Sequence, residues 1–286
     1  MKAWSEVFPH LDERSQKPRT RGATMVIDKC QGLTSMTDLL ALTGDFVDHW
    51  KLSFGTSALL YEDVLRKKIE VARDYNLLVY PGGTLTEYAV LKGVYPEFIR
   101  RARELGFNGV EISDGTIHIE PDIRRDLIQY ALDFGLTVVA EVGKKDPREQ
   151  PTPAKLAKQA LLDFESGASW VIVEARESGK GVGVYGKDGD VHEQDVDTII
   201  AMLNSHLDRL IWEAPLKNQQ EYLILRFGPD VGLGNIQPRE VLATEALRAG
   251  LRFETLRPVV EKMEQEEGLS MAERISKMLH RKVPEA

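Results

Sequence analysis

Residues 137–175 read TVVAEVGKKDPREQPTPAKLAKQALLDFESGASWVIVEA and contain one complete strand–helix–strand pattern. The apolar runs at the two ends are short and rich in valine, a composition typical of buried strands. Between them, Thr152 and Pro153 mark a helix start, an N-cap followed by proline at the first helical position, and the apolar stripe stops before Gly167. The stretch therefore predicts two parallel strands joined by a crossover helix.

The same alternation extends over most of the chain. Eight short apolar or β-branched runs recur: 24–28, 46–52, 77–80, 109–113, 137–142, 170–175, 210–214 and 231–236. A doubly wound open sheet has the same alternation, but eight units in 286 residues favour closure into an α/β fold of the (β/α)8 TIM-barrel type. We expect a single domain, with the barrel at about 20–256 and a helical tail at about 257–286.

The tail is highly charged and has a helix signal of its own. Ser270 and Glu273 form a capping box. Four apolar positions then fall on one helical face: Met271, Ile275, Met278 and Leu279. We expect this helix to cover the barrel or a neighbouring subunit.

Composition excludes several classes of protein. A net charge of -8 and a pI near 5.4 argue against a nucleic-acid or anionic-membrane surface, so any anion site is local. Cys30 is the only cysteine, which rules out an internal disulfide. The chain has neither a signal-peptide run nor an apolar stretch approaching the roughly 20 residues of a membrane span, so we expect a cytoplasmic protein.

Four consecutive predicted strands each end with a glutamate. In a barrel strand alternate side chains point inward, and the C-terminal ends line the mouth where barrel enzymes do their chemistry. Ser113 shares the parity of the first glutamate, Lys145 shares that of the second, and Lys144 has the opposite parity. The four residues that we expect to face inward together are Glu111, Glu141, Glu174 and Glu213.

Several buried carboxylates in one mouth need compensating cations or protons. Basic residues at the same strand ends are Lys29, Lys51, Lys144, Lys145 and Arg176. Mg²⁺ suits such oxygen ligands, whereas the histidines show no zinc-ligand spacing. Candidate ligands are Asp28, Glu111, Glu141, Glu174 and Glu213, and the sequence does not choose among them. The alternative is that the glutamates only form ion pairs that close the end of the barrel.

Glycine-rich turns follow three of the strands, at 80–84, 178–183 and 232–235. Such turns can direct successive backbone N–H groups at a phosphate, and the last lies where barrels often bind phosphate. Its glycines can equally serve tight packing within the barrel. The spacing of Gly181, Gly183 and Gly186 matches a dinucleotide fingerprint, but no helical pattern follows at once, so we expect a mobile loop over the mouth.

Five ordered blocks resemble the phosphosulfolactate synthase family, a (β/α)-barrel group with archaeal members in coenzyme M biosynthesis and plant heat-stress-associated relatives. The blocks are YPGGTL at 80–85, EISDG at 111–115, EVGKK at 141–145, EARESG at 174–179 and EAP at 213–215. The resemblance covers about 20–255. Two loops depart from the family pattern, DKCQGL at 28–33 and KLSFGT at 51–56, but both keep their charged residues.

The resemblance implies a lyase that adds sulfite to phosphoenolpyruvate with Mg²⁺, giving (2R)-phospho-3-sulfolactate. It favours Lys145 as the proton donor, and we assign Glu141 and Arg176 to the catalytic set with it. Substrate binding is assigned to Lys29, Lys51, Ser113, Lys144, Gly232, Gly234 and Asn235. Metal binding is assigned to Asp28, Glu111, Glu174 and Glu213. The family also implies a homo-oligomer, with a trimer as one form, and we expect neither nucleic acid nor membrane as a partner.

A second hypothesis is a stress-related binding protein that keeps the barrel but acts through partners, as the plant relatives suggest. The charged amphipathic tail is the feature that favours it. Replacing Lys145 and truncating the tail would distinguish the two hypotheses.

Overall fold

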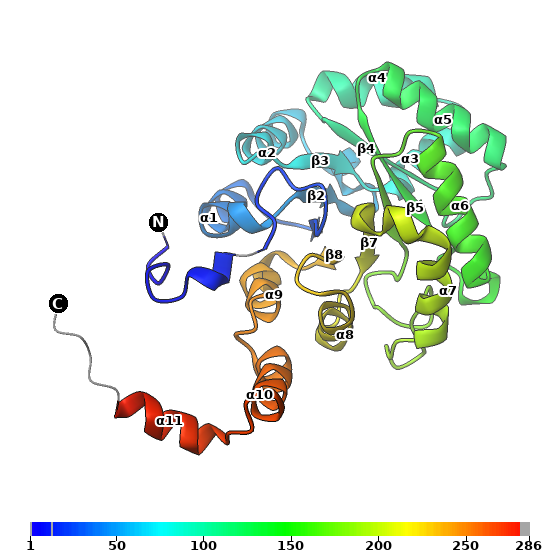
Figure 1. Cartoon of the computed structure of the whole chain (residues 1–286). Helices are drawn as coiled ribbons and strands as arrows, with labels where there is room; N and C mark the ends of the chain where they lie inside the picture. The colour runs from blue at the N-terminus through cyan, green and yellow to red at the C-terminus, as the bar shows by residue number, and fades with distance from the viewer. Residues whose placement is uncertain (1, 13, 281–286) are drawn as a thin grey trace.

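The computed structural model describes residues 2–12 and 14–280. Eight parallel strands form one sheet in the order β3-β2-β1-β8-β7-β6-β5-β4, curled into a nearly closed barrel (Figure 1). The strands are β1 Thr24–Asp28, β2 His49–Leu52, β3 Leu78–Pro81, β4 Gly109–Ser113, β5 Thr137–Val142, β6 Trp170–Val173, β7 Leu210–Glu213 and β8 Gly232–Ile236. The predicted TIM barrel is confirmed.

Helices surround the sheet (Figure 1). They are α1 Leu33–Thr43, α2 Glu62–Asp74, α3 Gly83–Leu91, α4 Tyr95–Leu105, α5 Pro121–Asp133, α6 Pro153–Glu165, α7 Glu193–Leu203, α8 Lys217–Phe227, α9 Val241–Arg248, α10 Phe253–Glu267 and α11 Met271–Leu279. Short 3-10 segments are η1 Pro9–Asp12, η2 Gly44–Phe46, η3 Ser53–Leu59, η4 Pro147–Glu149, η5 Asn204–Arg209 and η6 Pro238–Glu240. The predicted start of α6 is confirmed, because Thr152 accepts a hydrogen bond from the amide of Lys155.

Some predicted strand ends are wrong by a few residues. The second strand begins at His49 rather than at residue 46, because Gly44–Phe46 forms a 3-10 turn after α1. The sixth strand ends at Val173 rather than at residue 175. There the amide of Ala175 donates to the Glu213 carboxylate (2.9 Å) rather than to a strand neighbour, so the ladder stops.

The inside of the barrel has an apolar lower layer and a charged upper layer. Met25, Tyr80, Val139, Ile172 and Ile211 are fully buried and pack together in the interior. Each such aliphatic side chain contributes about 1.5–3 kcal/mol when fully buried. Two residues beyond Val139, Ile172 and Ile211, the same parity carries a glutamate. The apolar layer therefore closes the barrel beneath the acidic mouth.

The C-terminal helices extend away from the barrel (Figure 1). In α10 the only buried residue is Thr255, and α11 buries none of its residues. The capping box of Ser270 and Glu273 is confirmed, but the helix does not cover the barrel; that it covers a neighbouring subunit stays a prediction. The helix signal was local, whereas docking requires a complementary apolar surface. Within residues 2–12 and 14–280, no helix is both long enough and apolar enough to cross a bilayer.

Candidate active site

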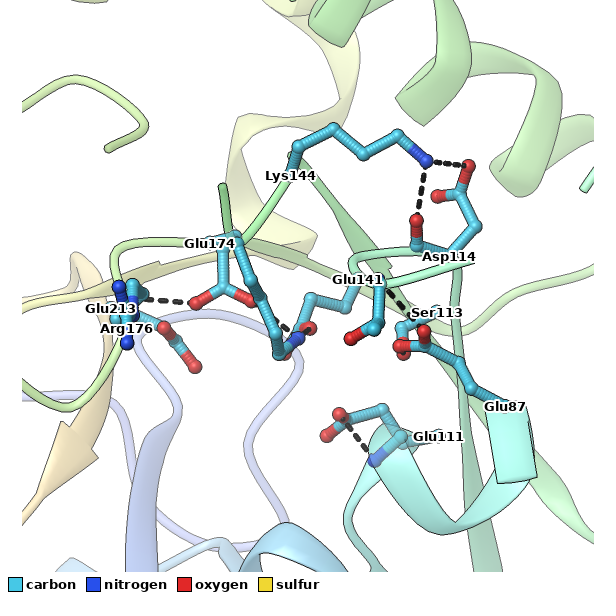
Figure 2. A network of polar contacts seen from close by, with 12 residues as sticks. Glu87, Glu111, Ser113, Asp114, Glu141, Lys144, Glu174, Arg176 and Glu213 are labelled. Atoms are coloured by element: carbon cyan, nitrogen blue, oxygen red, sulfur yellow. Dashed lines mark hydrogen bonds and ion pairs between the residues drawn. The ribbon is translucent and has the colours of Figure 1, made fainter. Parts of the chain in front are cut away.

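A pocket of about 230 Å³ opens at the C-terminal ends of the strands. The charged side chains on its wall come from β2, β4, β5 and β7 and from the loops that follow β5 and β6; Figure 2 shows the four glutamates and Arg176 among them. They are Lys51, Glu111, Glu141, Lys145, Glu174, Arg176, Glu177 and Glu213. The convergence predicted from strand parity is therefore observed for all four glutamates.

Lys51 lies at the centre of the acidic layer and is almost completely buried. Its Nζ is 2.9 Å from Glu111 Oε2, 2.9 Å from Glu141 Oε2 and 3.5 Å from Glu213 Oε1. Burial alone would lower the pKa of this ammonium, but the three carboxylates more than offset that effect and raise the pKa well above its usual value. Lys51 is therefore held protonated, and its ammonium pairs with carboxylates from β4, β5 and β7.

Lys145 lies higher in the mouth and is partly open to solvent. Its Nζ is 2.7 Å from Glu141 Oε1 and 2.6 Å from Glu174 Oε2. Desolvation opposes the charged form, but Glu141 and Glu174 outweigh it and raise the pKa of Lys145 above its ordinary value. The ammonium is thus held protonated between two carboxylates at the edge of the pocket.

The acidic layer has more carboxylates than cations. Four buried glutamates face two lysines, a surplus of two negative charges. Burial raises the pKa of Glu111 to about 8 and raises that of Glu213 well above its usual range. Burial also favours protonation of Glu141, but Lys145 and Lys51 outweigh it and hold the pKa low. The site therefore takes up either protons or a further cation.

The carboxylate and amide oxygens of the pocket are of the kind that Mg²⁺ prefers. Asn235 Oδ1 is a buried oxygen of a pocket-lining residue that accepts no hydrogen bond, whereas Glu111 Oε2 pairs with the Lys51 ammonium (2.9 Å). No group of three or more Asp, Glu, His or Cys in the described part of the chain forms a preassembled metal cluster. Mg²⁺ usually binds through one or two carboxylates, retained waters and substrate oxygens, so a partial set with surplus charge is sufficient.

Asp28 lies outside the pocket, apart from the glutamates. Its neighbour Ile27 lines the pocket, so the alternate parity turns Asp28 toward α2. There its carboxylate accepts from Trp50 Nε1 (2.9 Å) and pairs with the buried Lys68 (2.7 Å). The residue is thus part of the packing between β1 and α2, and the metal role predicted for it has no geometric support.

Two predicted binding residues, Lys144 and Ser113, do not line the pocket. Lys144 points away from the glutamates and pairs with Asp114 (2.8 Å; Figure 2). Ser113 donates to Glu87 (2.7 Å) and is covered by Gly83 at the start of α3. Both residues therefore stabilise the wall of the pocket and do not face the space where a substrate would bind.

The β8 glycines are explained by packing. A Cβ on Gly232 would lie 2.2 Å from the Leu210 carbonyl oxygen, and one on Gly234 would lie 2.7 Å from Met25 Cε. Asn235, three residues after the first glycine in the same strand, does line the pocket. The two glycines therefore serve tight packing within the barrel, and of the three residues assigned to substrate binding on β8 only Asn235 lines the pocket.

The rim carries the other predicted residues. Arg176 lines the pocket with its backbone in the left-handed region (φ 59°), and its carbonyl accepts from Asn235 Nδ2 (3.2 Å). Lys29 pairs with Glu177 across the mouth (2.9 Å). The glycine-rich segment after β6 is packed against the loop that precedes α6. Val182 is buried, and the amide of Gly183 donates to Gln150 Oε1 (2.9 Å).

Sequence reasoning missed part of the wall. Ser53, Phe54 and Thr116 line the pocket, and the backbone of Phe54 is left-handed (φ 60°). The KLSFGT loop carried a signal, a glycine directly after an aromatic residue at a strand end. Glu87, buried behind the site on α3, had no sequence signal, because its partners lie at least 26 positions away.

An acidic pocket with fixed lysines, placed where the strands of a (β/α)8 barrel end, defines a barrel enzyme with its site at the C-terminal mouth. A family model described as (2R)-phospho-3-sulfolactate synthase (ComA) matches residues 12–254. The chain therefore belongs to the (2R)-phospho-3-sulfolactate synthase family, whose members are lyases.

Three relatives illustrate the range of the family. A phosphosulfolactate synthase of Methanothermobacter thermautotrophicus is 44% identical over 245 residues, covering 85% of this chain and 94% of its own. A phosphosulfolactate synthase of Bacillus subtilis is 37% identical, with 86% and 96% covered. Protein HEAT-STRESS-ASSOCIATED 32 of Arabidopsis thaliana is 22% identical, with 84% and 90% covered.

Proposed function

We propose that this protein catalyses the addition of sulfite to phosphoenolpyruvate, giving (2R)-phospho-3-sulfolactate. Family membership supports the reaction, and one observation supports the chemistry: the Lys145 ammonium is fixed between Glu141 and Glu174 at the edge of a pocket also lined by Lys51. The substrates are multiply charged anions, so a pocket with fixed cations at an otherwise acidic mouth gives them defined orientations.

In the proposed reaction the sulfur of sulfite attacks the methylene carbon of phosphoenolpyruvate and forms a C–S bond. The π electrons of the double bond move toward the carbon that bears the phosphate and into the substrate carboxylate. A proton then goes to that carbon, and no leaving group departs. Lys145 supplies this proton, because pairing with Glu141 and Glu174 keeps it protonated. Lys51 and Arg176 face the developing negative charge.

Mg²⁺ is part of the proposal. Glu111 and Glu213 would hold it, since both are buried pocket carboxylates in a layer with surplus negative charge, and Asn235 adds an oxygen that accepts no hydrogen bond. When bound, the ion would offset the surplus charge and stabilise charge on the substrate carboxylate. Asn235 and Arg176 lie on the same wall and would contact the phosphate or sulfite.

The test is direct. Purified protein is mixed with Mg²⁺, phosphoenolpyruvate and sulfite, and the product is followed by ³¹P and ¹³C NMR. We expect a new phosphate ester with a carbon bonded to sulfur, lost in Lys145→Ala and after treatment with EDTA. Absence of product over a range of pH and divalent metals would refute the proposal.

We further propose that the protein works in the cytoplasm as a homo-oligomer, as the family resemblance implies. A second candidate function, a binding protein acting through partners, is favoured by the exposed apolar side chains of α11, including Ile275 and Met278. Under that function, removal of α11 would abolish partner binding and Lys145→Ala would leave it intact.

A further inference from the structure

Glu87 is a buried carboxylate that the proposed reaction does not use. It lies on α3 with 2% of its surface exposed. One oxygen accepts from Ser113 Oγ (2.7 Å), and the other accepts from the backbone amides of Thr116 (2.8 Å) and Ile117 (3.0 Å). Among the residues that the structure describes, no cation lies within ion-pair distance of it. Burying a carboxylate without a cation costs folding free energy. Here the three hydrogen bonds from neutral donors offset that cost, and they fix the groups that donate them.

The donors belong to the loop that follows β4, residues 114–117. Lys144 holds the opposite side of this loop: its Nζ donates to the carbonyl oxygens of Asp114 and Ile117 and pairs with the Asp114 carboxylate (2.8 Å; Figure 2). Asp114 is bound in addition by the buried Arg124 (3.1 Å). The loop is therefore fastened on two sides by charged groups that do not line the pocket.

This loop packs directly against Lys145. The Lys145 amide donates to the carbonyl oxygen of Gly115 (2.9 Å). A Cβ on Gly115 would lie 2.6 Å from Lys145 Nζ and 3.2 Å from its Cγ, so the lysine stem has no free space on that side. Thr116, the next residue, lines the pocket. The position of the loop backbone thus decides where the ammonium sits relative to Glu141 and Glu174.

We propose that Glu87 and Lys144 are positioning residues that fold the 114–117 loop into a wall and so place the Lys145 ammonium. They touch neither substrate nor reacting atoms. Their effect on catalysis passes through Lys145 and in that respect rests on the proposed function. Their effect on the position of the Lys145 ammonium does not depend on the proposed function. The positioning role and the proposed function can therefore be tested separately.

The principal variant is Glu87→Gln, which keeps the side-chain volume but turns one acceptor into a donor facing either Ser113 or the two amides. The control is Glu97→Gln, on the exposed surface of α4. The first readout is the rate of acetylation of Lys145 by acetic anhydride, quantified by mass spectrometry against the exposed Lys158. We expect about a 10-fold faster reaction at Lys145 in Glu87→Gln, with Lys158 unchanged, because the ammonium leaves its carboxylates.

The second readout is steady-state kinetics with phosphoenolpyruvate and sulfite. A misplaced proton donor lowers kcat by about 10- to 100-fold and leaves KM nearly unchanged. Partial unfolding would speed the acetylation of the buried Lys51 and Lys68 as well, whereas displacement of the loop speeds that of Lys145 alone. Lys144→Met should give the same signature from the other side of the loop. Glu97→Gln should match the wild type in both readouts.

If Glu87→Gln does not fold, Gly115→Ala takes its place. Its added methyl group would lie 2.6 Å from Lys145 Nζ and so displaces the lysine directly, without a change at Glu87. It should raise Lys145 acetylation and lower kcat in the same way. Unchanged Lys145 acetylation in a folded Glu87→Gln or Gly115→Ala protein would overturn the proposal. If acetylation changes but the wild type does not convert phosphoenolpyruvate, the positioning role stands and the proposed function fails.

Discussion

At the residue scale, Lys51 stabilises the acidic layer. Lys51→Met keeps the apolar stem but leaves Glu111, Glu141 and Glu213 without their shared cation. Removing one partner of a buried ionic network costs about 3–5 kcal/mol. We expect the free energy of unfolding at pH 7, measured by urea denaturation, to fall by about 3 kcal/mol.

The matched control combines Lys51→Met with Glu111→Gln, which removes one of the stranded negative charges. The double variant should regain part of the lost stability. A single variant as stable as the wild type would mean that the carboxylates are already protonated and that Lys51 compensates nothing.

The buried His49, two residues before Lys51 on β2, is expected to give the stability of the protein a pH dependence. It is buried in the barrel interior beside Tyr80 and Trp170, and burial lowers its pKa from 6.5 to about 4. The unfolded chain therefore binds a proton between pH 6.5 and 4 that the folded chain does not bind. Stability from this group is complete above pH 6.5 and falls by up to about 3 kcal/mol as the pH drops to 4.

The measurement compares urea unfolding of wild type and His49→Gln at several pH values. Carboxylates contribute equally to both proteins, so the difference between the two curves isolates the histidine. The wild type should lose more stability than the variant between pH 6.5 and 4. Parallel curves would contradict a neutral buried His49.

Strand parity placed part of the site correctly from sequence. The period of two is strict within a strand, so the inward direction of Glu111, Glu141, Glu174 and Glu213 followed from their spacing to apolar neighbours. Parity did not reveal that Ser113, although on the same face as Glu111, is covered by α3. That contact depends on where a helix packs, which no local pattern encodes.

At the element scale, the tail behaves as a separate unit. Since α11 buries none of its residues, truncation after Glu267 should change the free energy of unfolding of the barrel by less than about 0.5 kcal/mol. Turnover of phosphoenolpyruvate should also be unchanged. Circular dichroism and urea denaturation of the truncated chain test the first expectation, and a loss above about 1 kcal/mol would indicate that α11 docks.

Element boundaries show why sequence patterns located the strands but not all of their ends. The eight strands were found because alternating apolar segments are local signals. The ends of β6 and β2 depend on tertiary hydrogen bonds and turns, such as the capture of the Ala175 amide by Glu213. A strand ends where another group takes its backbone donors, and that group comes from elsewhere in the chain.

At the scale of the whole molecule, the barrel has a seam. β3 and β4 stand at the two ends of the hydrogen-bonded strand order. A side chain bridges them: Asn108 Oδ1 accepts from the amide of Val79 (2.7 Å), and its Nδ2 donates to the Leu77 carbonyl oxygen (3.0 Å). Higher up, the amide of Gly83 donates to Glu111 Oε1 (2.7 Å). The acidic layer and the closure of the barrel therefore share this seam.

Asn108→Ala should open the seam without changing the core. Two backbone groups lose their partners in a half-buried place, which costs about 2 kcal/mol in the free energy of unfolding. Hydrogen exchange of the Val79 amide should accelerate by about 10-fold, while amides of β6, on the far side of the barrel, keep their rates. Asn108→Asp retains the acceptor for the Val79 amide but loses the donor to the Leu77 carbonyl oxygen. Its free energy of unfolding should lie between those of the wild type and Asn108→Ala. Equal exchange at Val79 in all three proteins would mean that neighbouring strands close the barrel without Asn108, because packing alone would then hold β3 against β4.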